Sequence, residues 1–298
     1  MDLDQLRAFI QVADCGSFSQ AATRLHLTQP AISKRIRALE LHLGASLFDR
    51  MGRRVLPTLA GQQLLASARD LLARLQDTEV LIRNQDGRVE GPLTLATSHH
   101  IGLHRLPETL RAYCRRHPQV QLDVRFEDSE VAHELVRSGS VEIGVVTLDP
   151  LRDASLAYLP LWTDTLCFVA APEHWLASGP RRLANLVEHA AILPGMGTYT
   201  GRIVADLFAR RGLTLRATMS TNYLETIRML VSIGLGWSAL PETMVDGTVQ
   251  RVQLVDDPRL ARALGCIVHP GRTLSNAARA FVKSLTDSAG VSVGDGGA

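Results

Sequence analysis

The most constraining feature of the sequence is the close succession of two helix-start signals within its first thirty residues. Ser17 and Gln20 have the spacing of a capping box, so a helix is expected to begin near Ser17. Thr28 stands two positions before Pro30, where Thr28 can cap a further helix whose first turn contains the proline. Two helices joined by so short a turn predict a helix-turn-helix, whose second helix enters the major groove of DNA.

The second helix of this pair has an apolar and a polar face. Ile32, Ile36, Leu39 and Leu43 recur in steps of four, three and four and form an apolar stripe. Gln29, at the helix start, is expected to reach a base edge, whereas the basic residues suit phosphates. The predicted DNA contacts are Ser17, Gln29, Pro30, Ser33, Lys34, Arg35, Arg37, Arg50, Arg53 and Arg54. A solvated amphipathic helix in a small bundle is the alternative interpretation.

Positive charge is concentrated in the N-terminal segment. Residues 1–58 contain eight Lys and Arg against five Asp and Glu, a net charge of +3, although the whole chain carries only +2. Arg50, Arg53 and Arg54 cluster around Gly52, as expected for a short basic hairpin beside the recognition helix. The segment is therefore predicted to be a winged helix-turn-helix that binds a polyanion.

The segment from residue 18 to residue 61 resembles the DNA-binding domain of LysR-type transcriptional regulators. The matching residues are Phe18-Ser19-Gln20-Ala21-Ala22, Leu25-His26-Leu27-Thr28-Gln29-Pro30-Ala31-Ile32-Ser33, Ile36, Leu39-Glu40, Leu43-Gly44, Leu47-Phe48-Asp49-Arg50, Thr58 and Gly61. The resemblance implies an N-terminal winged helix-turn-helix, a linker helix and a C-terminal α/β domain of two lobes, like a periplasmic binding protein. It also implies a homodimer or dimer of dimers, a partly palindromic site on double-stranded DNA, RNA polymerase as a partner and a small-molecule co-inducer.

A long helix is predicted between residues 58 and 84, a stretch that contains no proline. Apolar residues recur there with alternating steps of four and three, a heptad seam of nearly three repeats. The residues predicted to form a dimer seam are Leu64, Ala68, Leu71, Leu75 and Ile82, with Thr78 in the same register. The alternative is one long helix packed against its own chain.

The C-terminal two hundred residues alternate short apolar runs with helical ones, which predicts an α/β domain with mostly parallel sheets. The strand candidates are 93–97, 122–126, 143–147, 166–170, 191–193, 215–219, 237–240 and 264–268, and the helix candidates are 103–116, 129–138, 201–211, 223–233 and 276–285. This pattern fits one large sheet or two lobes, and the family resemblance favours two. The expected domains are 1–58 (DNA-binding), 59–86 (linker), 91–287 (effector-binding, with lobe I at 91–160 and 264–287 and lobe II at 161–263) and a flexible tail at 288–298.

Hydroxyl and histidine side chains gather where strands pass into helices, and free N–H groups at helix starts favour small anions. The predicted effector contacts are Thr97, Ser98, His99, His100, Thr147, Gly197, Thr198, Tyr199, Thr200, Arg202, Asn222 and Tyr223. Ser98, His100, Thr147, Thr198 and their neighbours match by position the effector-contacting loops of the LysR-type family that the sequence resembles. Each hydroxyl could instead be an ordinary helix cap.

Neither catalysis nor a metal site is expected. His99, His100 and His104 could hold zinc, but the ligand geometry and a fourth position are unaccounted for. Ser98 lacks a G-x-S-x-G elbow, and the four cysteines have no CxxC spacing. Two acids in the first four residues do not fit a secretory signal, so a cytoplasmic protein without a membrane segment is expected. The rival functions are a solute-binding protein and a metal- or cofactor-dependent enzyme.

Overall fold

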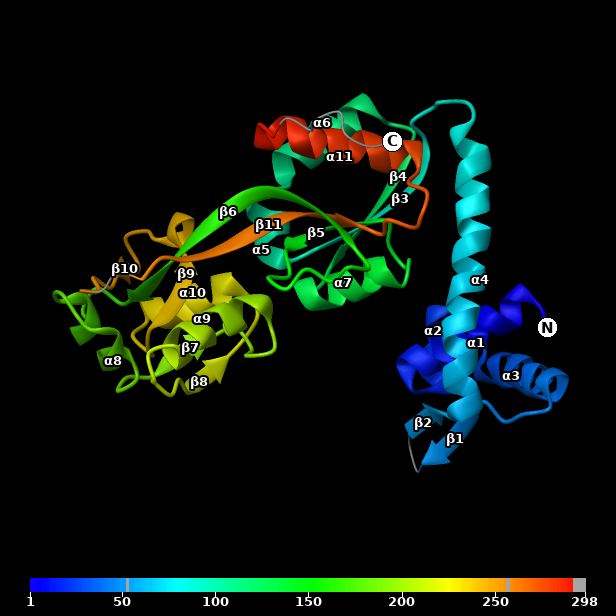
Figure 1. Cartoon of the computed structure of the whole chain (residues 1–298), viewed down its shortest axis with the longest axis horizontal. Coiled ribbons are helices and arrows are strands. Elements are labelled where there is room, and N and C mark those ends of the chain that lie inside the picture. The colour runs from blue at the N-terminus through cyan, green and yellow to red at the C-terminus, as the bar shows by residue number, and fades with distance from the viewer. Residues whose placement is uncertain (52–53, 256–257, 292–298) are drawn as a thin grey trace. The chain divides into compact units, whose positions relative to one another are not determined.

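The structure is a computed structural model that describes residues 1–51, 54–255 and 258–291 (Figure 1). For residues 50, 51 and 54 only the backbone is described. The chain divides into two compact units, Met1–Arg83 and Asn84–Ala298. Each unit has its own hydrophobic core. The two are described separately below.

The first unit is a small helical domain with a hairpin. Its elements are α1 (Leu3–Cys15), α2 (Phe18–Arg24), α3 (Gln29–Leu43), β1 (Phe48–Met51), β2 (Arg54–Pro57) and α4 (Leu59–Asn84). The two predicted helix starts are confirmed, because Ser17 Oγ accepts from Gln20 N–H and Thr28 Oγ1 accepts from Ala31 N–H, both at 3.4 Å. The predicted hairpin is confirmed as well, since β1 and β2 pair antiparallel from Phe48 opposite Pro57 to Met51 opposite Arg54.

Helix α4 contributes its first half to the core of this unit. Ala68 is fully buried, and Leu64 packs against the same cluster as Phe9, Ile32 and Leu39. Ala68 of the predicted dimer seam therefore packs within its own domain, and Leu64 is partly covered by the same cluster. Further along the same seam the side chains reach the surface, Leu71 with 48% of its area exposed and Ile82 with 63%, while Leu75 is half-buried.

The second unit is built on a seven-stranded sheet with the order β10-β6-β11-β5-β3-β4 and with β9 paired to β6. Its strands are β3 (Gly91–Thr97), β4 (Val120–Phe126), β5 (Ile143–Thr147), β6 (Ala157–Ala170), β9 (Ser238–Pro241), β10 (Gln250–Arg251) and β11 (Leu260–Val268), and a second sheet pairs β7 (Ala191–Leu193) with β8 (Ala217–Ser220). Its helices are α5 (His99–His104), α6 (Pro107–Arg116), α7 (Ser129–Arg137), α8 (Leu183–Leu186), α9 (Tyr199–Ala209), α10 (Leu224–Ser232) and α11 (Asn276–Ala289), with short 3₁₀ turns at Trp175–Ala177 and Glu242–Met244.

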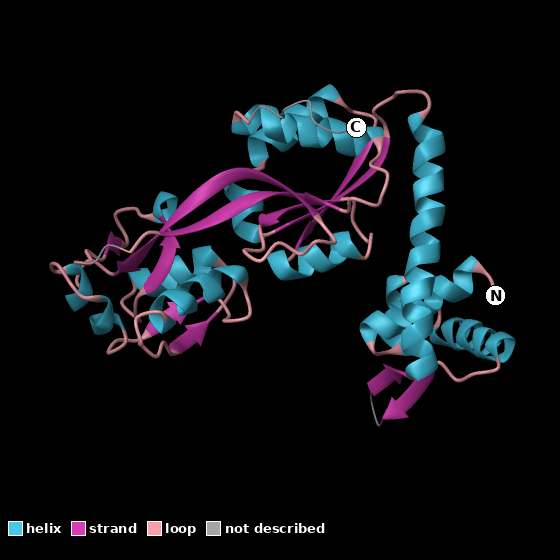
Figure 2. Ribbon diagram, viewed as in Figure 1, coloured by secondary structure: helices cyan, strands magenta, loops and turns pink. Residues whose placement is uncertain are grey.

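Two lobes share the long strands β6 and β11, which run from one lobe into the other (Figure 2). Lobe I packs α6 and α11 on β3 and β5, around Leu93, Tyr113 and Phe281. Lobe II contains α8, α9, α10, β7 and β8, and its core includes Phe208 and Trp237. The two lobes expected from the family resemblance are thus present. The single large sheet, given as the alternative, is present as well, because β6 and β11 belong to both lobes.

Two expectations about this unit are wrong. The large sheet is mixed rather than mostly parallel, because β3 pairs parallel with β4 and β5, whereas β6 and β11 are antiparallel to each of their neighbours. Strands that cross between lobes in opposite directions impose this pairing. The helix expected at 103–116 is two helices, α5 and α6, and Pro107 opens the second, where its missing N–H costs no hydrogen bond.

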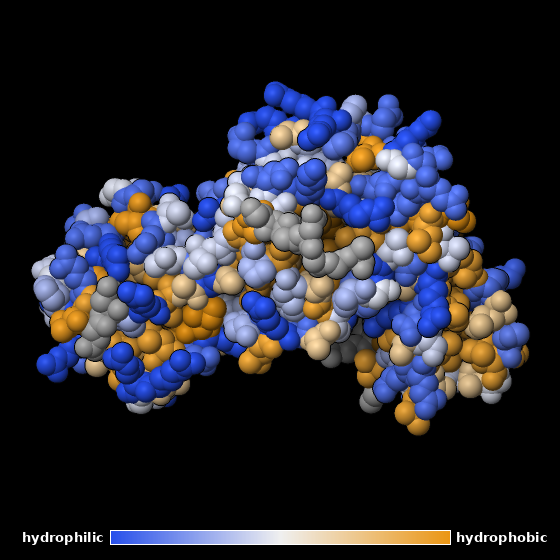
Figure 3. Space-filling view, turned by 45° about the horizontal axis from the view of Figure 1, so that its top comes forward, coloured by the Kyte–Doolittle hydropathy of each residue, from blue (hydrophilic) through white to orange (hydrophobic). Residues whose placement is uncertain are grey.

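Hydrophilic side chains cover most of the face drawn in Figure 3, with apolar ones between them. Within the described part of the chain, every helix is too short or too polar to cross a lipid bilayer.

Candidate functional site

The polar face of α3 is open at the start of the helix. Gln29 and Pro30 are exposed, and Gln29 Nε2 donates to Ser33 Oγ at 3.1 Å. Lys34 and Arg37 extend from the same helix and are exposed. The opposite stripe is buried at Ile32, Ile36 and Leu39, as predicted, although Leu43 remains 41% exposed.

Two of the residues predicted to contact DNA have partners inside the domain. Arg35 Nη2 donates to Asp4 Oδ2 of α1 at 2.9 Å, and Ser17 holds the start of α2. A groove of about 430 Å³ lies beside α3 and is lined by Phe18, Pro30, Ser33, Lys34, Ile36, Arg37, Glu40 and Phe48. Of the predicted basic hairpin residues, Arg53 and the side chains of Arg50 and Arg54 lie outside the described residues.

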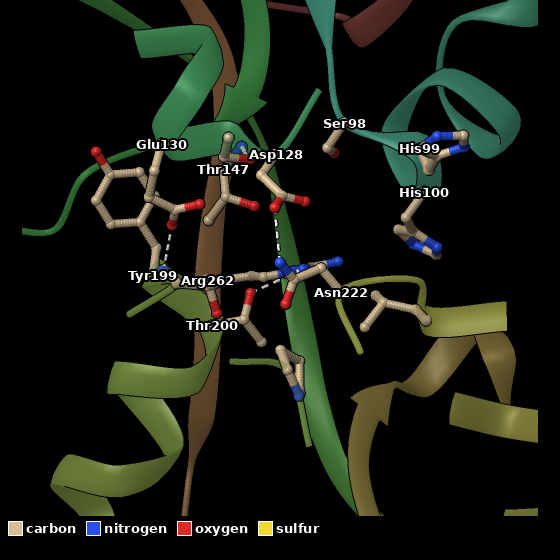
Figure 4. A pocket seen from close by; sticks show the side chains of 14 residues that line it. Ser98, His99, His100, Asp128, Glu130, Thr147, Tyr199, Thr200, Asn222 and Arg262 are labelled. Carbon is tan, nitrogen blue, oxygen red and sulfur yellow. Dashed lines mark hydrogen bonds between the residues drawn. The ribbon is translucent and has the colours of Figure 1, made fainter. Parts of the chain in front are cut away.

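A small cavity lies between the two lobes of the second unit (Figure 4). It has a volume of about 50 Å³, enough for a few water molecules. Eight predicted effector contacts line it, namely Ser98, His99, His100, Thr147, Thr198, Tyr199, Thr200 and Asn222. Six further lining residues were not predicted: Asp128, Ser129, Glu130, Pro194, Leu224 and Arg262.

Four predicted contacts do not line this cavity. Thr97 is fully buried and its hydroxyl donates to Val145 O at 2.8 Å, inside the sheet. The Arg202 guanidinium lies 4.9 Å from the ring centroid of Tyr199, and the Tyr223 ring packs edge-on against His99. Gly197 precedes the lining residue Thr198 in the loop before α9.

The start of α9 faces a carboxylate of lobe I. Thr198 Oγ1 caps the helix by accepting from Gly201 N–H at 3.0 Å. This hydroxyl is therefore a helix cap, which is the alternative role for the predicted effector contacts. The N–H of Tyr199 donates to Glu130 Oε1 from the first turn of α7. Burial raises the pKa of the Glu130 carboxyl, and the hydrogen bond from Tyr199 only partly offsets the rise. The helix N-terminus thus already binds a carboxyl group of the chain itself.

A second hydrogen bond spans the two lobes. Asn222 Nδ2 donates to Asp128 Oδ2 at 2.6 Å, and Asn222 Oδ1 accepts from Gly195 N–H at 3.0 Å. Figure 4 shows this bond beside the one between Glu130 and Tyr199. Both acids stand at the start of α7 in lobe I, and both partners stand at the start of helices in lobe II.

The wall of the cavity contains a buried ion pair. Arg262 of β11 lies in register with Asp164 of β6, and its Nη2 and Nε donate to Asp164 Oδ2 at 3.0 and 3.3 Å. Nη1 of Arg262 donates to Thr200 Oγ1 at 3.0 Å, and Arg105 Nη2 reaches Asp164 Oδ1 at 2.8 Å. Burial alone would raise the pKa of Asp164, but the two guanidinium groups hold that pKa below its ordinary value. The guanidinium groups of Arg262 and Arg105 therefore share the single carboxylate of Asp164.

Sequence reasoning missed Arg262 and Glu130 for a physical reason. Arg262 stands 98 residues from Asp164 and 62 from Thr200, and Glu130 stands 69 from Tyr199. Only a folded chain brings such groups together. The one local signal is an arginine at position 262 within an otherwise small and apolar strand.

A third cluster lies at the edge of the cavity, where α5 of lobe I meets the first turn of α10. Glu225 Oε1 lies 3.2 Å from His100 Nδ1 and 2.9 Å from His104 Nε2. The hydrogen bond with His100 is the largest cause that lowers the pKa of Glu225, to about 2, and the hydrogen bond with His104 adds a smaller effect. Burial opposes this shift.

Comparisons with known proteins agree with this architecture. Residues 86–290 match the LysR substrate binding domain, and residues 3–62 match the bacterial regulatory helix-turn-helix protein, lysR family. The uncharacterized HTH-type transcriptional regulator YeiE of Escherichia coli K12 is 32% identical over 284 residues, covering 94% of this chain and 95% of YeiE.

Solved structures extend the likeness to the whole fold. A full-length OxyR variant from Pseudomonas aeruginosa superposes with a TM-score of 0.67 at 25% identity, over 97% of this chain and 94% of OxyR. CbnR in complex with its target DNA gives a TM-score of 0.62 at 23% identity, over 97% and 100%, which shows the fold alone. The chain belongs to the LysR family of transcriptional regulators, with an N-terminal helix-turn-helix for DNA and a C-terminal effector-binding domain.

Proposed function

We propose that the exposed start of α3 reads a specific DNA sequence. Gln29 is exposed at the first position of the helix, and its amide contacts Ser33 one turn later, outside the hydrophobic core. A side-chain amide in this position is suited to base edges. Lys34 and Arg37 supply phosphate contacts from the same exposed face. Arg35 contributes less, because Asp4 holds its guanidinium.

The test compares basic residues of one helix by the salt dependence of DNA binding. Arg37→Ala should weaken binding to specific and random DNA alike and reduce the salt slope by about one unit per lost phosphate contact. Arg35→Ala is the matched control and should change that slope less. Gln29→Ala should mainly reduce the preference for the specific site. Equal losses on both DNAs for Gln29→Ala would contradict the base-reading role.

We propose that the effector is a small anionic metabolite bound between the lobes at the start of α9. The observation that carries this proposal is the bond from Tyr199 N–H to the Glu130 carboxylate, because a backbone donor that holds an internal carboxylate suits an external one equally well. Arg262 and Thr200 add a guanidinium and a hydroxyl at the same wall. The effector's anionic group would then displace Glu130 from Tyr199.

Such displacement offers a switch. The Glu130–Tyr199 and Asp128–Asn222 bonds join the lobes, so an effector that replaces one of them favours a different arrangement of the lobes. An effector shifts the regulator only if it binds one arrangement more tightly than the other. We propose that this shift acts on the DNA-binding domains of a homodimer or dimer of dimers in the cytoplasm, in concert with RNA polymerase and without catalysis.

A thermal-shift titration with sulfate and small dicarboxylates tests the anion site, because a ligand that binds the native state raises its apparent stability. Thr198→Ala removes the hydroxyl that caps α9, and Ser275→Ala is the matched control, since Ser275 Oγ caps α11 at the same 3.0 Å outside the cavity. Both variants should lose stability, but only Thr198→Ala should lose the response to anions. An equal response in all three proteins would overturn the proposed site.

A further inference from the structure

We propose that His100, His104 and Glu225 form a binding site for a divalent first-row transition-metal ion that links the two lobes beside the effector pocket. Among the described residues, these three make the set of His, Cys, Asp and Glu side chains whose ligand atoms lie within 4.8 Å of one another. Two imidazole nitrogens and one carboxylate oxygen are ligands that zinc and its neighbours accept.

The carboxylate lies at a suitable distance from each histidine nitrogen for one ion, and all three ligand atoms lie within 4.8 Å of one another. Metal–ligand bonds of about 2.1 Å at tetrahedral angles separate the ligand atoms by roughly 3.4 Å. Glu225 Oε1 lies 3.2 Å from His100 Nδ1 and 2.9 Å from His104 Nε2, close to that separation. His100 and His104 stand one turn apart on α5, so a single helix presents both rings to the carboxylate.

The burial of the three side chains differs in a way that suits an accessible metal. His100 is 5% exposed, whereas His104 is 50% and Glu225 30% exposed. An ion could enter from the His104 side and keep one coordination position for water or for a donor atom of a bound molecule. The ligand set differs from the three histidines considered in the sequence, because Glu225, more than a hundred residues away, takes the place of His99 beside His100 and His104.

The second ring nitrogen of His100 faces a carboxylate. His100 Nε2 lies 3.9 Å from Asp164 Oδ2, and Asp164 is fixed by Arg262 and Arg105. Metal-binding histidines commonly direct their other nitrogen to such a group, which fixes the ring and its tautomer. At 3.9 Å the contact is too long for a hydrogen bond, but it places a carboxylate beside the His100 nitrogen that does not face Glu225.

The ion would join elements of both lobes. The histidines stand on α5 of lobe I, and Glu225 stands in the first turn of α10, which packs on β9 and β7 in lobe II. His104 and Glu225 lie outside the lining of the effector cavity, and His100 is the one proposed ligand that also lines it.

The test is calorimetric titration of the full-length protein with Zn²⁺ alone, together with Co²⁺ absorption spectra that report the coordination geometry. We expect one ion per chain, a higher unfolding temperature with Zn²⁺, and affinity lower by more than about tenfold in His104→Ala and Glu225→Gln. His117→Gln, which removes a lobe I histidine outside the cluster, should bind like the wild type.

The sulfate response of the same variants separates this proposal from the effector site. His104→Ala and Glu225→Gln should keep it, which shows that the folded pocket survives. Absence of Zn²⁺ binding to the wild type, or Zn²⁺ binding that both variants retain, would overturn the metal site while leaving the anion proposal untouched.

Discussion

The DNA-binding unit and the effector pocket are held together over very different sequence distances. In the first unit, Ser17 and Thr28 each cap a helix through a bond to a residue three positions later. In the pocket, Glu130 and Asp128 bond to partners 69 and 94 residues away. The charges differ too, since Arg35 and Asp4 pair at the surface, whereas Arg262 and Asp164 pair in the interior. Local signals specify the helices of the DNA-binding unit, whereas the contacts at the cavity depend on the tertiary fold.

The largest expected effect comes from removing the buried carboxylate. Asp164→Ala leaves Arg262 and Arg105 without their shared acceptor, and breaking a buried ion pair costs about 3–5 kcal/mol of unfolding free energy. Urea unfolding followed by tryptophan fluorescence measures it, because Trp162, Trp175 and Trp237 all lie in the second unit.

Asp123→Ala is the control for that experiment. Asp123 pairs with Arg125 at 3.1 Å on the surface of the same unit, and an exposed pair of this kind is worth less than about 1 kcal/mol. A loss of similar size in both variants would break the contrast between buried and surface charge.

The second prediction concerns the exposed half of the α4 seam. Leu71→Asp and Ile82→Asp should each weaken the dimer by about 2 kcal/mol or more, since they place a charge where two copies of the helix are expected to meet. Sedimentation equilibrium measures the change. Leu81→Asp is the control, because Leu81 is as exposed but lies off the heptad positions. An equal effect of Leu81→Asp would contradict the seam.

The contrast also explains how much the sequence could predict. Capping residues, Pro30 and the apolar stripe of α3 specify their helix locally, so the helix-turn-helix followed from the residues alone. Most of the cavity-lining hydroxyls were found because strand–helix junctions are visible in a sequence. Arg262, Asp128 and Glu130 were missed, because their place in the pocket depends on the pairing of β6 with β11 and on the approach of α7 to α9 and α10. The mixed sheet was missed for the same reason.

The third prediction uses the raised pKa of Glu130. Lowering the pH through that raised pKa protonates Glu130, which removes the negative charge that competes for Tyr199 N–H. Sulfate should therefore bind more tightly as the pH falls. Glu130→Gln should bind sulfate roughly tenfold more tightly at neutral pH, because a nearby negative charge has been removed.

The pH dependence of that variant is the decisive measurement. Asp128 raises and Arg202 lowers the pKa of Glu130, and both remain in the variant, as do His99 and His100 at the cavity wall. The wild type and Glu130→Gln therefore differ only in the carboxyl group at position 130. If the wild type and Glu130→Gln show the same pH profile for sulfate, Glu130 does not compete with the anion.

The smallest expected effect is at the surface pair of the DNA-binding unit. Asp4→Asn breaks the 2.9 Å contact with Arg35, in which Asp4 is 57% exposed, so hydrogen exchange of α1 and α3 should report a loss below about 1 kcal/mol. The freed guanidinium should nevertheless reach DNA phosphates and increase the salt slope on random DNA by up to about one unit. Asp14→Asn makes the same charge change but releases Arg69 of α4, not a residue of α3. A slope that rises equally in both variants would mean that net charge, and not the position of Arg35 on the recognition helix, determines the gain. A rise confined to Asp4→Asn would show that the N-terminal unit, unlike the pocket, changes its function through a contact that hardly changes its stability.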